Sequence, residues 1–166
     1  VLRAILENYN KKIEVVAIND LGSIEANAHL IKYDSTHGIL NHDIKTSKDG
    51  FIINTQNIKV FAERDPQNIP WKDVGVDIVL ECTGIFLDKS SALKHIKAGA
   101  KKVIISAPGK EVDFTIVQGV NSNELKKDHN IISNGSCTTN CLAPVAMVLE
   151  KTFGINYGYM TTIHSY

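Results

Sequence analysis

The sequence has 166 residues, 43% of them hydrophobic, and its 18 basic side chains balance its 18 acidic ones. This length suits one domain, or one domain with part of another. The lack of a polybasic segment argues against nucleic acid as a partner. No apolar run reaches the roughly 18 residues that a membrane span needs. Only three cysteines are present, which indicates a reducing, cytoplasmic setting.

Hydrophobic periodicity divides the chain into alternating helices and strands. Helical spacing and end signals predict helices over 1–9, 23–33, 88–100 and from Cys137 to about Lys151. Short runs rich in Val and Ile predict strands within 11–20, 75–84, 101–108, 113–121 and 129–134. The segment 42–66 alternates and contains an Asp49-Gly50 turn, which predicts antiparallel ribbons. The last segment, 156–166, also alternates like a strand.

Apolar strands that alternate with helices are typical of a parallel sheet covered on both faces. We therefore predict an α/β fold with a mostly parallel, doubly wound sheet. Ligands of such sheets bind at the carboxyl ends of the strands. Four polar residues follow predicted strands here: Asp20, Thr83, Ser106 and Ser136. This polar rim is the first candidate for a binding site.

An acidic residue after a strand, such as Asp20, is half of a dinucleotide-binding fingerprint. The other half, a Gly-rich turn about 20 residues upstream, would lie before residue 1. The helix over 1–9 would then continue the helix that receives the pyrophosphate. In this interpretation Asp20 accepts hydrogen bonds from the adenine ribose. The alternative is a strand that simply ends in turn-forming residues.

Cys137 lies at the junction of a predicted strand and a predicted helix. Unpaired amides and the helix dipole favour a thiolate there, which makes Cys137 a candidate nucleophile. The same place suits an anion such as a substrate phosphate, with Ser136 and Thr138 on either side. Cys141 is one turn deeper, and we expect a buried structural thiol. Both cysteines could instead be small core residues.

Zinc is a poor explanation for this cysteine pair, because a structural zinc site needs four ligands and the sequence offers no second pair. Cys82 is expected to pack at a strand end. A nucleophilic cysteine also needs a base, and the sequence has six histidines. His164 is the best candidate because it follows a predicted strand beyond the Cys137 helix. Sequence spacing alone does not exclude the other five histidines as the base.

Several segments resemble the phosphorylating glyceraldehyde-3-phosphate dehydrogenases of glycolysis. The most specific is SNGSCTTNCLAPVA around Cys137. Others follow in family order: VVAINDL, KYDSTHG, AERDP, DIVLECTGIF, AGAKKVIISAP and MTTIHSY. The resemblance covers essentially the whole chain. Cys82 stands where Ser is common and Gly135 where Ala is common, and neither position is a reacting group.

The resemblance implies roles for individual residues. Cys137 matches the nucleophile that attacks the aldehyde, and His164 matches its base. Ser136 and Thr138 match phosphate-binding residues beside the nucleophile. The residues that match the NAD-binding groups are Asp20 at the adenine ribose, Arg64 beside the adenine, Thr83, Gly84 and Phe86 in the cofactor groove, and Ser106 near the nicotinamide. The implied substrates are glyceraldehyde 3-phosphate and inorganic phosphate, with no metal.

The resemblance also implies a domain plan. Residues 1–136 match a Rossmann-type NAD-binding domain without its first strand and Gly-rich turn, and 137–166 match the beginning of an α+β catalytic domain. Most of that domain would follow, and the complete protein would be a homotetramer. Two alternatives stay open at this point. One is the related erythrose-4-phosphate dehydrogenase, and the other is a nucleotide-binding or interaction fragment without turnover.

Overall fold

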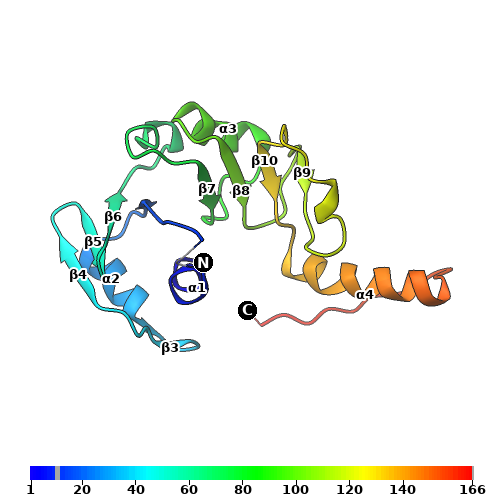
Figure 1. Ribbon diagram of the computed structural model, residues 1–166. Helices are drawn as coiled ribbons and strands as arrows, with labels where there is room; N and C mark the ends of the chain where they lie inside the picture. The colour runs from blue at the N-terminus through cyan, green and yellow to red at the C-terminus, as the bar shows by residue number, and fades with distance from the viewer. Residues whose placement is uncertain (10–11, 166) are drawn as a thin grey trace. The chain divides into compact units, whose positions relative to one another are not determined.

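The computed structural model describes residues 1–9 and 12–165, which fall into two compact units, Val1–Val76 and Asp77–Tyr166 (Figure 1). The domain boundary predicted after residue 136 stays a prediction. Among the described residues, no helix has the length and apolar character that crossing a membrane requires.

The first unit is built on a four-stranded sheet with the order β1-β6-β5-β4. Its strands are β1 (Ala17–Asn19), β4 (Ile44–Ser47), β5 (Gly50–Ile53) and β6 (Gln56–Phe61). β1 and β6 are parallel, whereas β4, β5 and β6 form the predicted antiparallel ribbons. Gly50 begins β5, and a Cβ there would lie 2.1 Å from the carbonyl oxygen of Ile58. Only glycine therefore allows this close pairing of strands.

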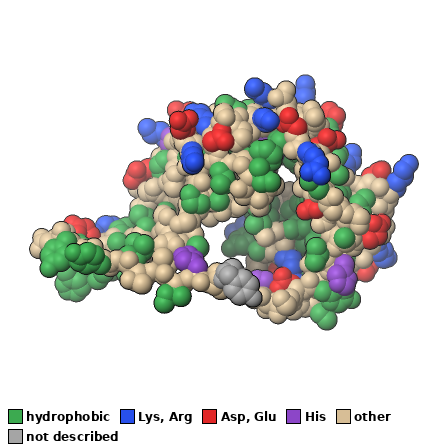
Figure 2. Space-filling view, turned by 180° about the vertical axis from the view of Figure 1, so that it is seen from behind, with side chains coloured by type: hydrophobic (Ala, Val, Ile, Leu, Met, Phe, Trp, Pro, Cys, Tyr) green, Lys and Arg blue, Asp and Glu red, His purple; other side chains and the backbone are tan. Residues whose placement is uncertain are grey.

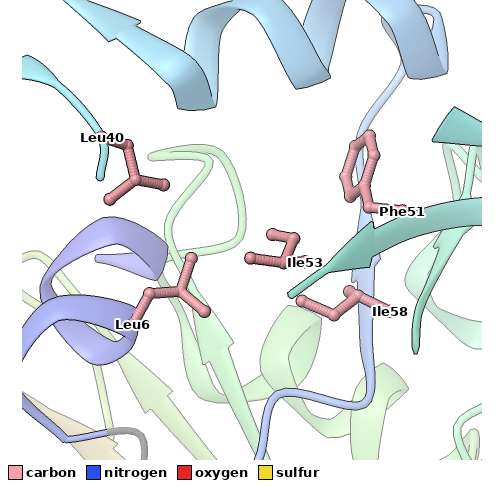
Figure 3. Close-up of a cluster of buried hydrophobic side chains, with 5 residues drawn as sticks. All are labelled: Leu6, Leu40, Phe51, Ile53 and Ile58. Atoms are coloured by element: carbon pink, nitrogen blue, oxygen red, sulfur yellow. The ribbon is translucent and has the colours of Figure 1, made fainter. Parts of the chain in front are cut away.

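Among the described residues, the first unit also contains the helices α1 (Leu2–Asn8) and α2 (Ile24–Lys32). Ser23 caps α2, because its hydroxyl accepts a hydrogen bond from the amide of Ala26 at 3.1 Å. The short strands β2 (Tyr33–Asp34) and β3 (Gly38–Ile39) pair antiparallel after it, and the 3-10 helix η1 spans Pro66–Asn68. A cluster of buried side chains joins α1 to the sheet: Leu6, Leu40, Phe51, Ile53 and Ile58 (Figure 3). Each such side chain stabilises the fold by roughly 1.5–3 kcal/mol.

The second unit contains a parallel sheet with the order β7-β8-β10-β9. Its strands are β7 (Ile78–Glu81), β8 (Lys102–Ile105), β9 (Phe114–Thr115) and β10 (Ile131–Ser133), and the 3-10 helix η2 spans Ser122–Glu124. The helix α3 (Lys89–Lys97) begins after its cap Asp88 and packs on β8 and β10. This confirms the predicted α/β class with parallel strands.

One face of β7 differs from the prediction of a sheet covered on both faces. Val79 and Glu81 are buried, whereas Ile78 and Leu80 are 51% and 41% exposed. Side chains alternate between the two faces of a strand. No described element buries the face that carries Ile78 and Leu80.

The longest helix, α4 (Cys137–Phe153), ends at Gly154, whose φ of +73° suits glycine. Large apolar side chains lie exposed along it: Leu142, Val145, Val148, Leu149 and Phe153. Figure 2 shows hydrophobic side chains gathered along this helix. The strand predicted over 156–166 is not formed, since the described residues up to 165 have no regular structure. A strand needs a hydrogen-bonding neighbour, and no described strand pairs with this segment.

Candidate functional site

The candidate nucleophile is the first residue of α4. β10 ends at Ser133, the chain turns through Asn134 and Gly135, and Ser136 caps the helix by accepting a hydrogen bond from the amide of Thr139 at 2.9 Å. Cys137 follows and is exposed to solvent. Cys137 is thus an accessible thiol at the positive end of a helix, which is where the sequence predicts it.

Two polar side chains that sequence reasoning missed hold the turn before Cys137. Ser133 is fully buried, and its hydroxyl accepts from the amides of Gly109 and Gly135, both at 3.0 Å, and donates to Ala107 at 2.8 Å. Asn140 donates to the carbonyl oxygens of Asn134 at 2.7 Å and Ser136 at 2.9 Å. In the sequence, only the position of Ser133, a polar residue at the end of an apolar strand, could have indicated this role.

The structure places His164 against the first turn of α4. Its Nε2 lies 3.4 Å from Oγ1 of Thr138 and 2.8 Å from Oγ1 of Thr162. Thr138 is the residue after the candidate nucleophile. Within the described part of the chain, no hydrogen bond joins the side chains of Cys137 and His164. The imidazole of His164 is therefore hydrogen-bonded to Thr138, the residue next to Cys137, and not to Cys137 itself.

The other two cysteines differ from the expectation of buried, packed thiols. Cys141 and Cys82 are both exposed. Cys141 is exposed because none of the residues of α4 is buried, so no described element covers its face of the helix. Over residues 1–9 and 12–165, no group of three or more His, Cys, Asp or Glu side chains could hold a metal ion.

Three residues of the predicted polar rim, Thr83, Ser106 and Ser136, follow strands of the second sheet. Asp20 follows β1 in the separate sheet of the first unit, so the four residues do not share one sheet as predicted. The amide of Ser106 donates to the carbonyl oxygen of Glu81 at 2.9 Å, and the amide of Asn134 donates to that of Ile105 at 2.9 Å. The carboxyl ends of β7, β8 and β10 therefore lie side by side. Thr83 and Gly84 follow β7 on this edge and are exposed. Phe86 is partly buried against the imidazole of His95.

In the first unit, Asp20 and Arg64 follow the neighbouring parallel strands β1 and β6. The side chain of Asn19 both donates to and accepts from the backbone of Glu63 at 2.9 Å, which holds the two strand ends together. Asp20 is exposed, and its Oδ1 accepts from the amide of Gly22 at 2.7 Å and from Nδ2 of Asn27 at 3.1 Å. Sequence reasoning missed Asn27, although it lies on the helix next to Asp20.

Comparison with known proteins decides the family. Residues 1–89 match the family model described as glyceraldehyde 3-phosphate dehydrogenase, NAD binding domain, and residues 136–166 match the C-terminal domain of the same family. The chain belongs to the glyceraldehyde-3-phosphate dehydrogenase family. Residues 1–89 are thus part of the NAD-binding domain of this family.

Curated relatives from three organisms agree with this assignment. Proteins named glyceraldehyde-3-phosphate dehydrogenase from Xanthobacter flavus, Geobacillus stearothermophilus and Thermotoga maritima are 53%, 54% and 51% identical to it, each over the whole chain. The chain spans about half the length of these relatives: 50%, 49% and 50%.

Proposed function

We propose that the chain is part of an NAD-dependent, phosphorylating glyceraldehyde-3-phosphate dehydrogenase, the enzyme that oxidises this aldehyde in glycolysis and works in reverse in gluconeogenesis. One observation carries the proposal beyond family membership. Cys137 is exposed at the first residue of α4, and the same helix turn contacts His164 through Thr138. A nucleophile and a base that meet at a helix N-terminus suit covalent catalysis on an aldehyde.

The thiolate of Cys137 attacks the carbonyl carbon of glyceraldehyde 3-phosphate, and the protonated imidazole of His164 gives its proton to the carbonyl oxygen, so that a thiohemiacetal forms. The imidazole of His164 takes the proton of the thiohemiacetal hydroxyl when hydride leaves, and a thioester to Cys137 remains. Inorganic phosphate then attacks the thioester carbonyl. The C–S bond breaks, 1,3-bisphosphoglycerate leaves and the thiolate is restored.

Phosphate groups are proposed to bind at the start of α4, which has 17 residues and therefore a developed dipole. Ser136 and Thr138 flank the nucleophile there. Thr138 contacts His164 through its hydroxyl, whereas the hydroxyl of Ser136 lies 2.8 Å from that of Thr139. A network of hydroxyls and amides on one helix turn is suited to bind a substrate phosphate beside the reacting carbon.

The described residues fit NAD as the cofactor. Asp20 is exposed at the end of β1, and among the described residues only its Oδ1 receives hydrogen bonds, which suits acceptance from ribose hydroxyls at Oδ2. Gly84 has a φ of +75°, and a Cβ added there would meet no atom within 4 Å, so a ligand can approach the backbone closely. The remaining residues proposed to hold the cofactor are Arg64, Thr83, Phe86 and Ser106. When bound, NAD accepts the hydride.

The proposal is tested on the full-length gene product that contains these residues. We expect NADH formation, followed by absorbance, with glyceraldehyde 3-phosphate, NAD and phosphate together, and none without phosphate once the thiol is acylated. Cys137→Ser should abolish turnover, and Cys141→Ser is the matched control that should retain it. Turnover only with erythrose 4-phosphate would assign the related dehydrogenase, and NAD binding without any turnover would assign a binding role. The homotetramer and the cytoplasmic location also stay predictions, and light scattering tests the first.

A further inference from the structure

Glu81 and His95 form a buried polar pair that the proposed chemistry does not use. Glu81 is the last residue of β7 and His95 lies in α3, and they are only 4% and 3% exposed. Nε2 of His95 lies 2.9 Å from Oε2 of Glu81. Burying such groups is unfavourable, and apolar residues of similar size often hold a core equally well. Stability alone therefore gives no reason for a carboxylate at this position.

The second oxygen of Glu81 faces the turn that follows its own strand. Oε1 accepts hydrogen bonds from the amide of Thr83 at 2.7 Å and from its hydroxyl. The hydroxyl oxygen of Thr83 in turn accepts from the amide of Ile85 at 3.1 Å. One hydrogen-bonded chain thus runs from the helix through the buried carboxylate to both sides of Gly84, where φ is +75°.

Glu81 retains its charge in this environment. Burial raises the pKa of its carboxyl, but the hydrogen bonds from His95 and Thr83 outweigh burial, so the pKa lies below its ordinary value. An ionised carboxylate accepts only, so Nε2 of His95 carries the proton that it donates. Hydrogen bonds to a charged acceptor are about twice as strong as neutral ones.

The turn held in this way is exposed and contains residues proposed to bind the cofactor. Thr83, Gly84 and Ile85 lie on the solvent side of the buried carboxylate. The ring of Phe86 also packs edge-on against the imidazole of His95, with centroids 6.4 Å apart and planes at 89°. His95 therefore supports both the turn, through Glu81, and Phe86 directly.

We propose that Glu81 and His95 are positioning residues for the dinucleotide cofactor, because they fix the Thr83–Ile85 turn and Phe86 in their binding geometry without touching the ligand. This inference rests on the proposed function, since it takes the cofactor to bind at this turn. Pre-formed binding loops spare the ordering entropy that a mobile loop loses on binding. Loss of the pair should therefore weaken cofactor affinity and leave the chemistry of Cys137 intact.

The test uses the full-length protein and replaces the whole pair by apolar side chains, as Glu81→Leu with His95→Leu. Removing both partners leaves no unpaired buried charge, so the protein should stay folded. We expect the NAD dissociation constant, measured by calorimetry, to rise about tenfold, while kcat at saturating NAD and the alkylation rate of Cys137 change less than about twofold. A folded double variant with wild-type NAD affinity would overturn the proposal.

If the double variant does not fold, two single variants test the positioning role of Glu81 and His95. Glu81→Gln keeps an acceptor for Thr83 and a donor that a neutral His95 can accept, so NAD affinity should stay within about threefold of wild type. His95→Phe removes the donor to Glu81 without changing any residue proposed to contact the cofactor, so it should weaken NAD binding several-fold, and unchanged affinity in folded His95→Phe would contradict the proposal. Wild-type protein that binds no NAD would instead refute the proposed function.

Discussion

Oγ1 of Thr138 lies 3.4 Å from Nε2 of His164, although 26 residues separate them in sequence. This contact places an imidazole beside the residue that follows Cys137 at the start of α4. A protonated imidazole near a thiolate favours its charge, and the helix N-terminus acts in the same direction. In the proposed function, His164 and the helix start would both favour the thiolate of Cys137.

The first prediction concerns alkylation of Cys137 in the full-length protein. Iodoacetamide should label Cys137 before Cys141, because only Cys137 lies among the unpaired amides of the helix start. His164→Asn should slow labelling of Cys137 about tenfold near pH 7, since the thiolate loses its imidazolium partner. Peptide mass spectrometry over time measures both rates.

Cys141 is the internal control for this experiment, because it is exposed on the same helix. His164→Asn should leave its rate unchanged. Equal labelling of Cys137 in the wild type and in His164→Asn across the pH range would remove His164 from this role.

The second prediction is a preference for NAD over NADP. Asp20 at the ribose would face the additional phosphate of NADP. Two like charges 4 Å apart repel by about 1 kcal/mol in bulk water and about 4 kcal/mol near a protein surface. Catalytic efficiency with NADP should therefore be at least about tenfold lower. Similar values of kcat/KM for the two cofactors would show that Asp20 does not face the ribose.

The third prediction concerns Asn27, which donates to Oδ1 of Asp20 at 3.1 Å and to the carbonyl oxygen of Ser23 at 3.1 Å. Asn27→Ala should raise the NAD dissociation constant about threefold to tenfold, because Asp20 loses one of the two donors that orient it. Asn8→Ala is a matched control, since Asn8 makes a similar bond to Ala4 at 3.2 Å on another helix. Equal NAD affinity of the two variants would contradict a role for Asn27.

The sequence predicts the edge that carries Thr83, Ser106 and Ser136, because the carboxyl ends of neighbouring parallel strands meet at one edge. It does not reveal that Asp20 follows a strand of a separate sheet. The contact between Glu81 and His95 depends on how α3 packs on the sheet. Local sequence patterns do not predict this packing, so the sequence could not reveal the contact. The alternation of apolar and polar residues over 156–166 indicates a segment that can form a strand. A strand needs a hydrogen-bonding neighbour, and none of the described strands pairs with this segment. The exposure of Cys141 likewise depends on what packs against α4.

The fourth prediction tests Gly135, which has a φ of +67° in the turn before Cys137. Gly135→Ala should lower the free energy of unfolding by about 1 kcal/mol, since non-glycine residues are strained in the left-handed region. An added Cβ would lie 3.4 Å from Cβ of Thr139, an ordinary contact, so the helix start should keep its structure. Gly158→Ala is the control, with no atom within 4 Å of its Cβ. Equal urea denaturation of both variants would contradict the prediction.

The last prediction concerns Asp113, which ties α3 to β10. Its Oδ1 accepts from Nζ of Lys89 at 2.6 Å, and its Oδ2 accepts from the amides of Asn130 at 2.8 Å and Ile131 at 2.9 Å. The hydrogen bond from Lys89 is the largest cause that lowers the pKa of Asp113 from 3.8 to about 2, and the two amides contribute in the same direction against the effect of burial.

A carboxyl with a lowered pKa in the folded state stabilises the protein fully above its unfolded pKa, and this contribution disappears as the pH falls through the folded pKa. For Asp113 the loss should occur between about pH 4 and pH 2 and, because solvent screens the exposed Lys89 ammonium, amount to roughly 1 kcal/mol. Urea denaturation of the full chain should therefore show a smaller decrease in stability over this range for Asp113→Asn than for the wild type. Lys89→Met should also reduce the decrease, because it removes the strongest partner. The same decrease in all three proteins would mean that Asp113 does not contribute to acid sensitivity.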